Sequence, residues 1–567
     1  MKRNFKNHAV VGVCALGLIG LNSCLKVDDA YDLDKEIDKT ITVGGDLTIP
    51  GSSTDNMMLK DLLEIEEGSA VQADAEGNYS IVQKGDDTNT DVEVPAVNVD
   101  LNMGFTGVKQ SFNMSSAAGE KVMVSLDEDI NINVVQDGIT SDIKSINSAV
   151  TSSENTYLVF SLTGNGGSAR LTKGYSIVFP EYLTVEAMSE GWNGNKNVLE
   201  LVKEDGMDIT ASTMVKFQIS GIRFGKNGAE FINNEGMTDN NSIVMGGSIN
   251  LDGDIEAVAN GNGGSIAIGV DIEADMMSVD EVMAVVDPEV DITIDPITLD
   301  DMPEFLSDDE VSIALTDPKI YIHLTNPSPV AVDMTADLWS YKTGKEDQKV
   351  SIPEFRIPAN RPNGYTICIN SKEGAQEDGV DEFVTVENLG DIIKFIPERI
   401  EMKNIVTEAV QEVITVKPGV KYNITTGYEV KTPLMFTEGT NIVYTETMDG
   451  WGSDLEDIEF NEIEATMSVN NQLPLGVKMS AVAVDNTGNV LDNVVVDMNM
   501  DIMAGATSDV KFNVTTTDGS IKGLDGLKLT VTATGSEETS GVCLNENQYI
   551  KITELKLKLK GGITMEL

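Results

Sequence analysis

The chain has 567 residues, with 39 Lys and Arg against 93 Asp and Glu, and a formal net charge of −54. This charge argues against binding to nucleic acid, because phosphate backbones are held by clustered cations. Apolar residues make up 41% of the chain, so it can bury real cores, and at about 150 residues per domain its length predicts three or four domains.

The first 23 residues have the parts of a secretory signal. A cationic start precedes an apolar stretch, residues 9–21, that is too short to span a bilayer. The segment 21–24, Leu-Asn-Ser-Cys, resembles the lipobox of bacterial lipoproteins, in which a small residue precedes the lipidated cysteine. The resemblance implies cleavage after residue 23 and acyl chains on Cys24 that hold the mature chain to a membrane. A free cysteine behind an ordinary signal peptide is the alternative.

Residues 24–45 are interpreted as an acidic tether. Asp28, Asp29 and Asp32 follow the cysteine closely, and this acidity is similar to the export signals of surface lipoproteins in the Bacteroidota. The resemblance implies an outer-membrane lipoprotein exposed on the cell surface, of the multi-domain β type found in gut Bacteroidota. A solvated spacer on the periplasmic side is the alternative.

Alternation of apolar and polar residues dominates the rest of the chain, as at 266–273, 494–502 and 552–560. Because successive side chains of a strand point to opposite faces, each run predicts a half-buried strand of an antiparallel sheet. Candidate helices are short, at 57–66 and 279–286. The pattern predicts an all-β chain of tandem antiparallel, Ig-like β-sandwich units with short helices, following a cleaved lipoprotein signal.

An internal echo indicates duplication. Residues 326–336 and 471–481 both begin with Asn, carry Pro at the fourth position, and continue as apolar-x-Val-x-Met-x-Ala. The pattern resembles Ig-like and late-embryogenesis-abundant β-sandwich modules, in which an Asn-Pro turn follows a strand. A fainter third copy begins near residue 142.

We therefore expect three related β domains after the tether. Their expected bounds are 46–235, 236–415 and 416–567.

Histidine and cysteine counts limit the chemistry. Of two histidines, His8 lies in the signal, so a mature chain keeps only His323 and holds no multi-His zinc or iron site. His323 stands in an alternating run and is interpreted as an ordinary strand residue. Cys368 and Cys543 lie among strand-like neighbours and are expected to be buried free thiols, with a disulfide between them as the alternative.

Two tryptophans are candidate glycan contacts. Trp192 and Trp451 stand in Gly-rich loops, where an exposed ring could contact the apolar face of a sugar. Plugs over the core are the alternative for both residues.

The acidic residues assign no catalytic or metal site. Paired carboxylates serve glycoside hydrolysis, but 93 acidic residues create such pairs by chance, as in the clusters 300–304, 308–310 and 454–457. Acidic loops at 252–254 and 449–454 are candidates for a structural calcium ion, although neither has EF-hand spacing. No other cofactor is expected.

The sequence thus favours a non-enzymatic lipoprotein, anchored to the outer membrane and surface-exposed. It would bind a protein or glycan partner or form part of a cell-envelope assembly. In a fimbria-like variant, the C-terminal strand at 555–559 would pair with a neighbour's sheet edge. A glycan-binding lipoprotein of a polysaccharide-uptake system is the alternative, followed by a carboxylate-dependent glycoside hydrolase.

Overall fold

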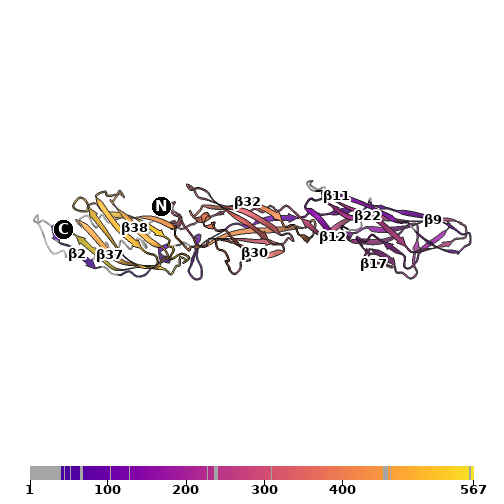
Figure 1. Ribbon diagram of the computed structural model, residues 1–567, viewed down its shortest axis with the longest axis horizontal. Coiled ribbons are helices and arrows are strands. Elements are labelled where there is room, and N and C mark those ends of the chain that lie inside the picture. Colours follow the sequence, from indigo (N-terminus) through magenta and orange to yellow (C-terminus); the bar gives the residue numbers. More distant parts are fainter. Residues whose placement is uncertain are drawn as a thin grey trace, which may run out of the picture.

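The computed structural model is an elongated rod built almost entirely of antiparallel strands (Figure 1). This confirms the predicted all-β class, and the sheets are consistent with tandem β-sandwich units. The structure describes residues 40–43, 45–50, 53–63, 65, 68–102, 104–126, 128–225, 228–234, 241–307, 309–450, 458–459, 461–560 and 563–566. The signal peptide, Cys24 and most of the tether lie outside these ranges.

Three hydrophobic cores follow one another along the described part of the rod. The first, here the distal module, is built mainly from residues 94–286. The second, the middle module, combines mainly residues 59–92 with 290–442. The third, the proximal module, is centred on residues 463–555. The chain therefore runs out along the rod and returns.

The predicted domain borders differ from these cores. The border at 235 falls inside the distal module, between β21 (Ala229–Ile232) and β22 (Asn241–Asp252), which pair with each other. The border at 415 falls inside β33 (Val413–Val416), which pairs with a distal strand. Sequence echoes suggested consecutive units, whereas the chain nests one module inside the next.

The distal module contains three sheets, with strand orders β33-β25-β12-β20-β13-β24-β9, β17-β18-β15-β22-β11-β8 and β10-β23-β14-β19. Beside β21, β22 and β33, its strands are β7 (Asn98–Asp100), β8 (Phe105–Thr106), β9 (Val108–Met114), β10 (Lys121–Ser125), β11 (Ile130–Ile139), β12 (Ile143–Ser153), β13 (Thr156–Gly164), β14 (Gly167–Leu171), β15 (Ser176–Val178), β16 (Leu183–Ala187), β17 (Trp192–Asn195), β18 (Val198–Leu201), β19 (Met207–Ile209), β20 (Thr213–Arg223), β23 (Asp254–Ala259), β24 (Gly264–Ala274) and β25 (Met276–Val286).

The middle module packs the sheet β31-β30-β27-β34-β5-β4 against the sheet β26-β32-β28-β29, with one parallel pair, β30 and β31. Its elements are α2 (Leu59–Leu63), β4 (Val71–Ala73), β5 (Tyr79–Lys84), β6 (Thr88–Glu93), β26 (Ile297–Thr298), α3 (Glu304–Ser307), β27 (Lys319–Asn326), β28 (Val332–Tyr341), β29 (Gln348–Ile357), β30 (Arg361–Asn370), β31 (Glu382–Thr385), η2 (Leu389–Ile393), β32 (Arg399–Ala409) and β34 (Lys421–Pro433).

The proximal module has the strand order β2-β42-β37-β40-β39-β38-β41-β35 and a small sheet β1-β43-β36. Its strands are β1 (Thr40–Val43), β2 (Leu47–Pro50), β3 (Met57–Met58), β35 (Asn441–Met448), β36 (Ile458–Glu459), β37 (Glu462–Asn471), β38 (Gly476–Val484), β39 (Val494–Ile502), β40 (Thr507–Thr516), β41 (Gly526–Thr534), β42 (Tyr549–Lys560) and β43 (Ile563–Glu566).

One helix prediction fails and another holds in part. The segment 57–66 contains α2, but 279–286 belongs to β25. Val279, Val282 and Ala284 are buried at a mixed spacing because the pairing of β25 with β12 shifts register along its length. A bulged strand therefore imitated a helical pattern.

The sequence echo corresponds to a repeated buried asparagine. Asn326 and Asn471 end β27 and β37, and both are fully buried. The Asn326 side-chain amide donates to the carbonyls four and 32 residues later, at 2.9 and 3.1 Å, and its Oδ1 accepts from the N–H two residues later at 3.0 Å. Asn471 makes the same three bonds at 2.8, 3.1 and 3.0 Å. The two modules share this clamp.

The described chain begins and ends at the same end of the rod. β1 pairs with the final strand, Thr40 opposite Glu566, and β2 pairs with β42. At the other end, β13 pairs with β24 up to the register Gly164↔Ile266, and β24 pairs with β9, which lies near the far right of Figure 1. The distal loops are therefore as far as the rod allows from residue 40.

Candidate functional site

The predicted glycan platform does not fit the position of Trp192. Its side chain is only 7% exposed and joins the distal core from β17, directly opposite Leu201. Since the hairpin β17–β18 turns that face inward, Trp192 is a core residue, the alternative weighed from the sequence. Trp451 lies outside the described residues.

The candidate calcium loop at 252–254 is a tight turn. Asp252 and Asp254 flank Gly253 in a tight turn packed on Tyr175, where an added Cβ would lie 2.7 Å from the Tyr175 Cα. Residues 451–454 of the second candidate loop lie outside the residues that the structure describes. Within the described ranges, no group of three or more His, Cys, Asp and Glu side chains could hold a metal ion.

The two thiols are free, Cys368 fully buried and Cys543 half-buried. Cys368 lies in β30 of the middle sheet, opposite Tyr321. Burial raises the pKa of its thiol to about 12. Because the thiolate is the reactive form, Cys368 is a poor nucleophile here.

One face of β27 gathers polar side chains. Lys319, Tyr321, His323 and Thr325 alternate along it and therefore project to the same side of the sheet. The rings of Tyr321 and His323 stack, with centroids 6.3 Å apart and planes 4° from parallel. His323 lies opposite Thr366 of β30 and Gly427 of β34.

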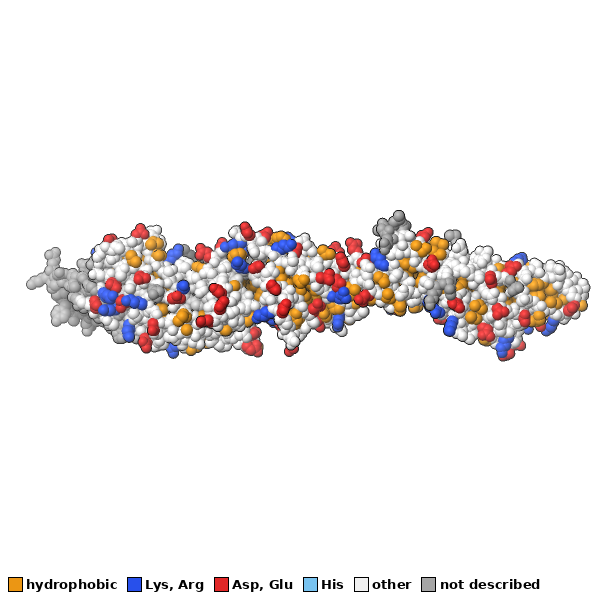
Figure 2. All heavy atoms as spheres, viewed as in Figure 1, with side chains coloured by type: hydrophobic (Ala, Val, Ile, Leu, Met, Phe, Trp, Pro, Cys, Tyr) orange, Lys and Arg blue, Asp and Glu red, His pale blue; other side chains and the backbone are white. Residues whose placement is uncertain are grey.

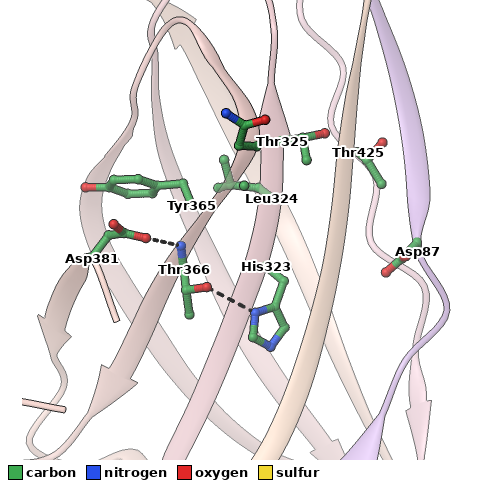
Figure 3. A pocket seen from close by; sticks show the side chains of 10 residues that line it. Asp87, His323, Leu324, Thr325, Tyr365, Thr366, Asp381 and Thr425 are labelled. Carbon is green, nitrogen blue, oxygen red and sulfur yellow. Dashed lines mark hydrogen bonds between the residues drawn. The ribbon is translucent and has the colours of Figure 1, made fainter. Parts of the chain in front are cut away.

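A shallow hollow of about 400 Å³, here the His323 hollow, opens on this face (Figure 3). Its volume lies in the range of small-molecule sites, about 300–1,000 Å³. It is lined by Asp87, His323, Leu324, Thr325, Asn363, Gly364, Tyr365, Thr366, Asp381 and Thr425.

Two glycines shape the His323 hollow. Gly427 has no side chain, and the Asp87 Oδ1 lies 2.1 Å from the position a Cβ would occupy there. Asp87 therefore lies directly over β34. Gly364 lines the hollow from β30 with a φ of +104°, a left-handed backbone that favours glycine.

Hydrogen bonds hold the polar groups in place. The Asp381 Oδ2 accepts from the Thr366 N–H at 2.8 Å. The His323 Nδ1 lies 3.3 Å from the Thr366 hydroxyl, and its Nε2 lies 3.4 Å from the Glu429 Oε2. The Lys84 ammonium lies 3.3 Å from the same Glu429 oxygen, so the Glu429 carboxylate contacts both Lys84 and His323.

A second hollow of about 300 Å³ lies farther along the same face, toward the proximal module. Glu377 dominates it, accepting from the Lys319 ammonium at 2.7 Å and the Tyr321 hydroxyl at 2.9 Å. Burial opposes ionisation of Glu377, but these two donors outweigh it and lower its pKa. Because Lys319 and Tyr321 both bond to Glu377, we interpret this hollow as structural rather than as a binding site.

Sequence reasoning missed the His323 hollow. The prediction that His323 is a strand residue is correct, but nothing in the sequence indicated that Asp87 and Asp381 lie near it. These carboxylates come from turns 236 residues before and 58 residues after the histidine. Only the register of β27 with β34 and β30 brings them together.

No family model matches the chain, and no curated protein matches it. Among solved structures, it is similar to a protein described as secreted, from Parabacteroides distasonis ATCC 8503, at 20% identity and a TM-score of 0.37, covering 50% of this chain and 83% of that one. A match to the T13 IBDV viral particle has 8% identity and a TM-score of 0.13, and covers 76% of each chain. TM-scores this low carry no argument about fold or function.

Proposed function

We propose that this chain is a non-enzymatic, surface-anchored lipoprotein that presents its distal module away from the outer membrane. The observation that carries the proposal is the position of β1, which begins at Thr40 at the proximal end of the rod, beside β43. A lipid on Cys24 would hold that end to the membrane and leave the distal module farthest from it.

The spacing between anchor and rod suits this role. Thr40 lies 16 positions after Cys24, with fifteen residues between them. Fully extended, they reach at most about 55 Å, so the tether holds the proximal module close to the membrane but free of it. No helix in the described ranges is long and apolar enough to cross a membrane.

The module junctions favour a stiff rod. β33 belongs to a segment between two middle strands, β32 and β34, yet pairs with β25 of the distal module. Its Val416 is buried in the distal core, together with Val330 and Ala409 from the middle segments. Several chain passes thus cross the junction, and bending there would break strand pairing.

The distal end differs in charge from the rest of the rod. Its loops contact one another: Gly119 N–H donates to the Ala259 carbonyl, and Asn260 N–H donates to the Gly166 carbonyl. Figure 2 shows this end mostly white and orange. In the loop segments 115–120, 164–167, 210–212 and 260–265, the one ionisable side chain is Glu120. An end with so few charges can approach a partner that the acidic rod would repel.

The proposal is tested by lipid labelling and cell shaving. Labelled palmitate should enter the wild-type chain but not Cys24→Ala, and the variant should leave the membrane fraction. Protease added to intact cells should remove the wild-type band while a periplasmic control protein survives. Unlabelled wild-type protein would contradict the anchor, and a protected band would contradict surface exposure.

A further inference from the structure

We propose that the His323 hollow binds a neutral, hydroxyl-rich ligand of the size of one or two sugar units. The inference goes beyond the proposed function. It rests on the middle module alone, so it stands or fails independently of the anchor and of the leaflet that the protein faces.

The lining supplies both halves of a hydrogen-bonding pattern. Asp87 and Asp381 offer carboxylate acceptors, and the Asn363 amide and the Thr325 hydroxyl can donate or accept. The Thr425 hydroxyl, whose proton goes to Asn89, can accept. A sugar hydroxyl is itself a donor and an acceptor, so it satisfies either kind of group. Small-molecule sites gain their specificity from such convergent polar groups.

Two of the polar groups are held in place by hydrogen bonds before a ligand arrives. Asp381 is held by the Thr366 N–H, and Thr425 donates its hydroxyl to the Asn89 Oδ1 at 3.0 Å. Asp87 projects toward the hollow in the direction of His323 (Figure 3), above the space that Gly427 leaves open. Side chains that are already ordered lose little entropy when they bind, which favours affinity.

Other ligand chemistries fit less well. In the described part of the chain, which includes the lining, no group of three or more His, Cys, Asp and Glu side chains could hold a metal ion. An apolar ligand would meet carboxylates, an amide and hydroxyls with nothing to satisfy them, at a cost in desolvation. A protonated amine could donate to the two carboxylates, but it could not accept from the donors around them. An amine is therefore one of the probes in the test.

His323 is itself the reporter. As the one histidine after residue 23, it gives a single imidazole signal in a mature chain labelled with ¹³C-histidine and purified in detergent. The probes are maltose, cellobiose and N,N′-diacetylchitobiose, each titrated to about 20 mM, with ethanolamine as the amine. At least one disaccharide should shift the His323 signal saturably, and ethanolamine should not.

Variants locate the effect. Asp87→Ala should weaken the disaccharide response about tenfold or more, and Thr425→Trp, which fills the hollow, should abolish it. Asp91→Ala, a matched carboxylate of β6 bonded to Asn423 outside the lining, should leave the response unchanged. The proposal is overturned if no disaccharide gives a saturable shift, if ethanolamine gives an equal one, or if Thr425→Trp retains it.

Discussion

At the scale of single residues, two buried asparagines fix connections between strands. Asn326 and Asn471, both fully buried, each hydrogen-bond to three backbone groups and so tie together segments up to 32 residues apart. An unsatisfied buried group costs about 1–3 kcal/mol, so one side chain sets the geometry of a whole strand connection.

Replacing Asn326 with Ala should therefore destabilise the middle module by about 2–4 kcal/mol, because three hydrogen bonds to the backbone and one to the Ser328 hydroxyl are lost at once. Asn471→Ala should do the same to the proximal module. Gln472→Ala is the control, since Gln472 is the exposed neighbour and should cost less than about 0.5 kcal/mol. Denaturant unfolding measures all three, and equal values for Asn471→Ala and Gln472→Ala would refute the clamp.

The thiols give a second prediction at this scale. Cys368 should stay unlabelled by an alkylating reagent at pH 8, because burial both shields it and raises its pKa to about 12. Cys543, which is half-buried, should react first. Peptide mass spectrometry after timed labelling distinguishes the two, and rapid native labelling of Cys368 would show that the middle sheet is more open than described.

At the scale of elements, the outer face of the proximal sheet carries an ion-pair network across β40, β37 and β42. Glu464 of β37 accepts from Lys511 at 2.6 Å and from Lys560 at 2.9 Å, and Lys560 also reaches Glu462 at 2.8 Å. The Lys511 and Lys560 hydrogen bonds lower the pKa of Glu464 to about 2. These pairs pin the register of the strongly alternating C-terminal strand.

This network predicts a pH dependence. Because the pKa of Glu464 is lower in the folded chain than its usual 4.5, its contribution is complete above about pH 4.5 and is lost as pH falls toward 2. Solvent screens these partly exposed charges, so the loss should be only about 0.5–1 kcal/mol. Glu464→Gln should flatten that part of the stability curve measured by denaturant titration. An unchanged slope in the variant would show that the network contributes nothing.

At the scale of the whole molecule, the modules are nested and share strands. Val416 belongs by sequence to the middle segments but is 2% exposed in the distal core, whereas Val413 of the same strand is 52% exposed. The two residues form a matched pair for testing whether the junction is shared.

Val416→Asp should loosen the distal module, because it buries an unpaired charge in that core, at a cost above about 3 kcal/mol. Val413→Asp should have little effect. Hydrogen exchange at β25, the partner of β33, reads out the difference. If β25 exchanges equally slowly in both variants, the junction is not held by β33.

Comparison of sequence and structure shows what local patterns can reveal. Alternation predicted the strands, and the echo at Asn326 and Asn471 predicted a shared connection, because both depend on near neighbours in the chain. The nesting of modules and the His323 hollow depend on pairing between segments hundreds of residues apart. Trp192 shows the same limit, since its Gly-rich flanks are visible in the sequence but the hairpin that turns it inward is not.

Two epitope insertions probed on intact cells would show whether the anchored rod holds its distal end outward. One epitope follows Asn262 in a distal loop, and the other follows Gly519 in a proximal turn. If the rod points outward, antibody binds strongly at the distal site and more weakly at the proximal site beside the membrane. A distal epitope that becomes accessible only after permeabilisation, together with a periplasmic control, would contradict this orientation.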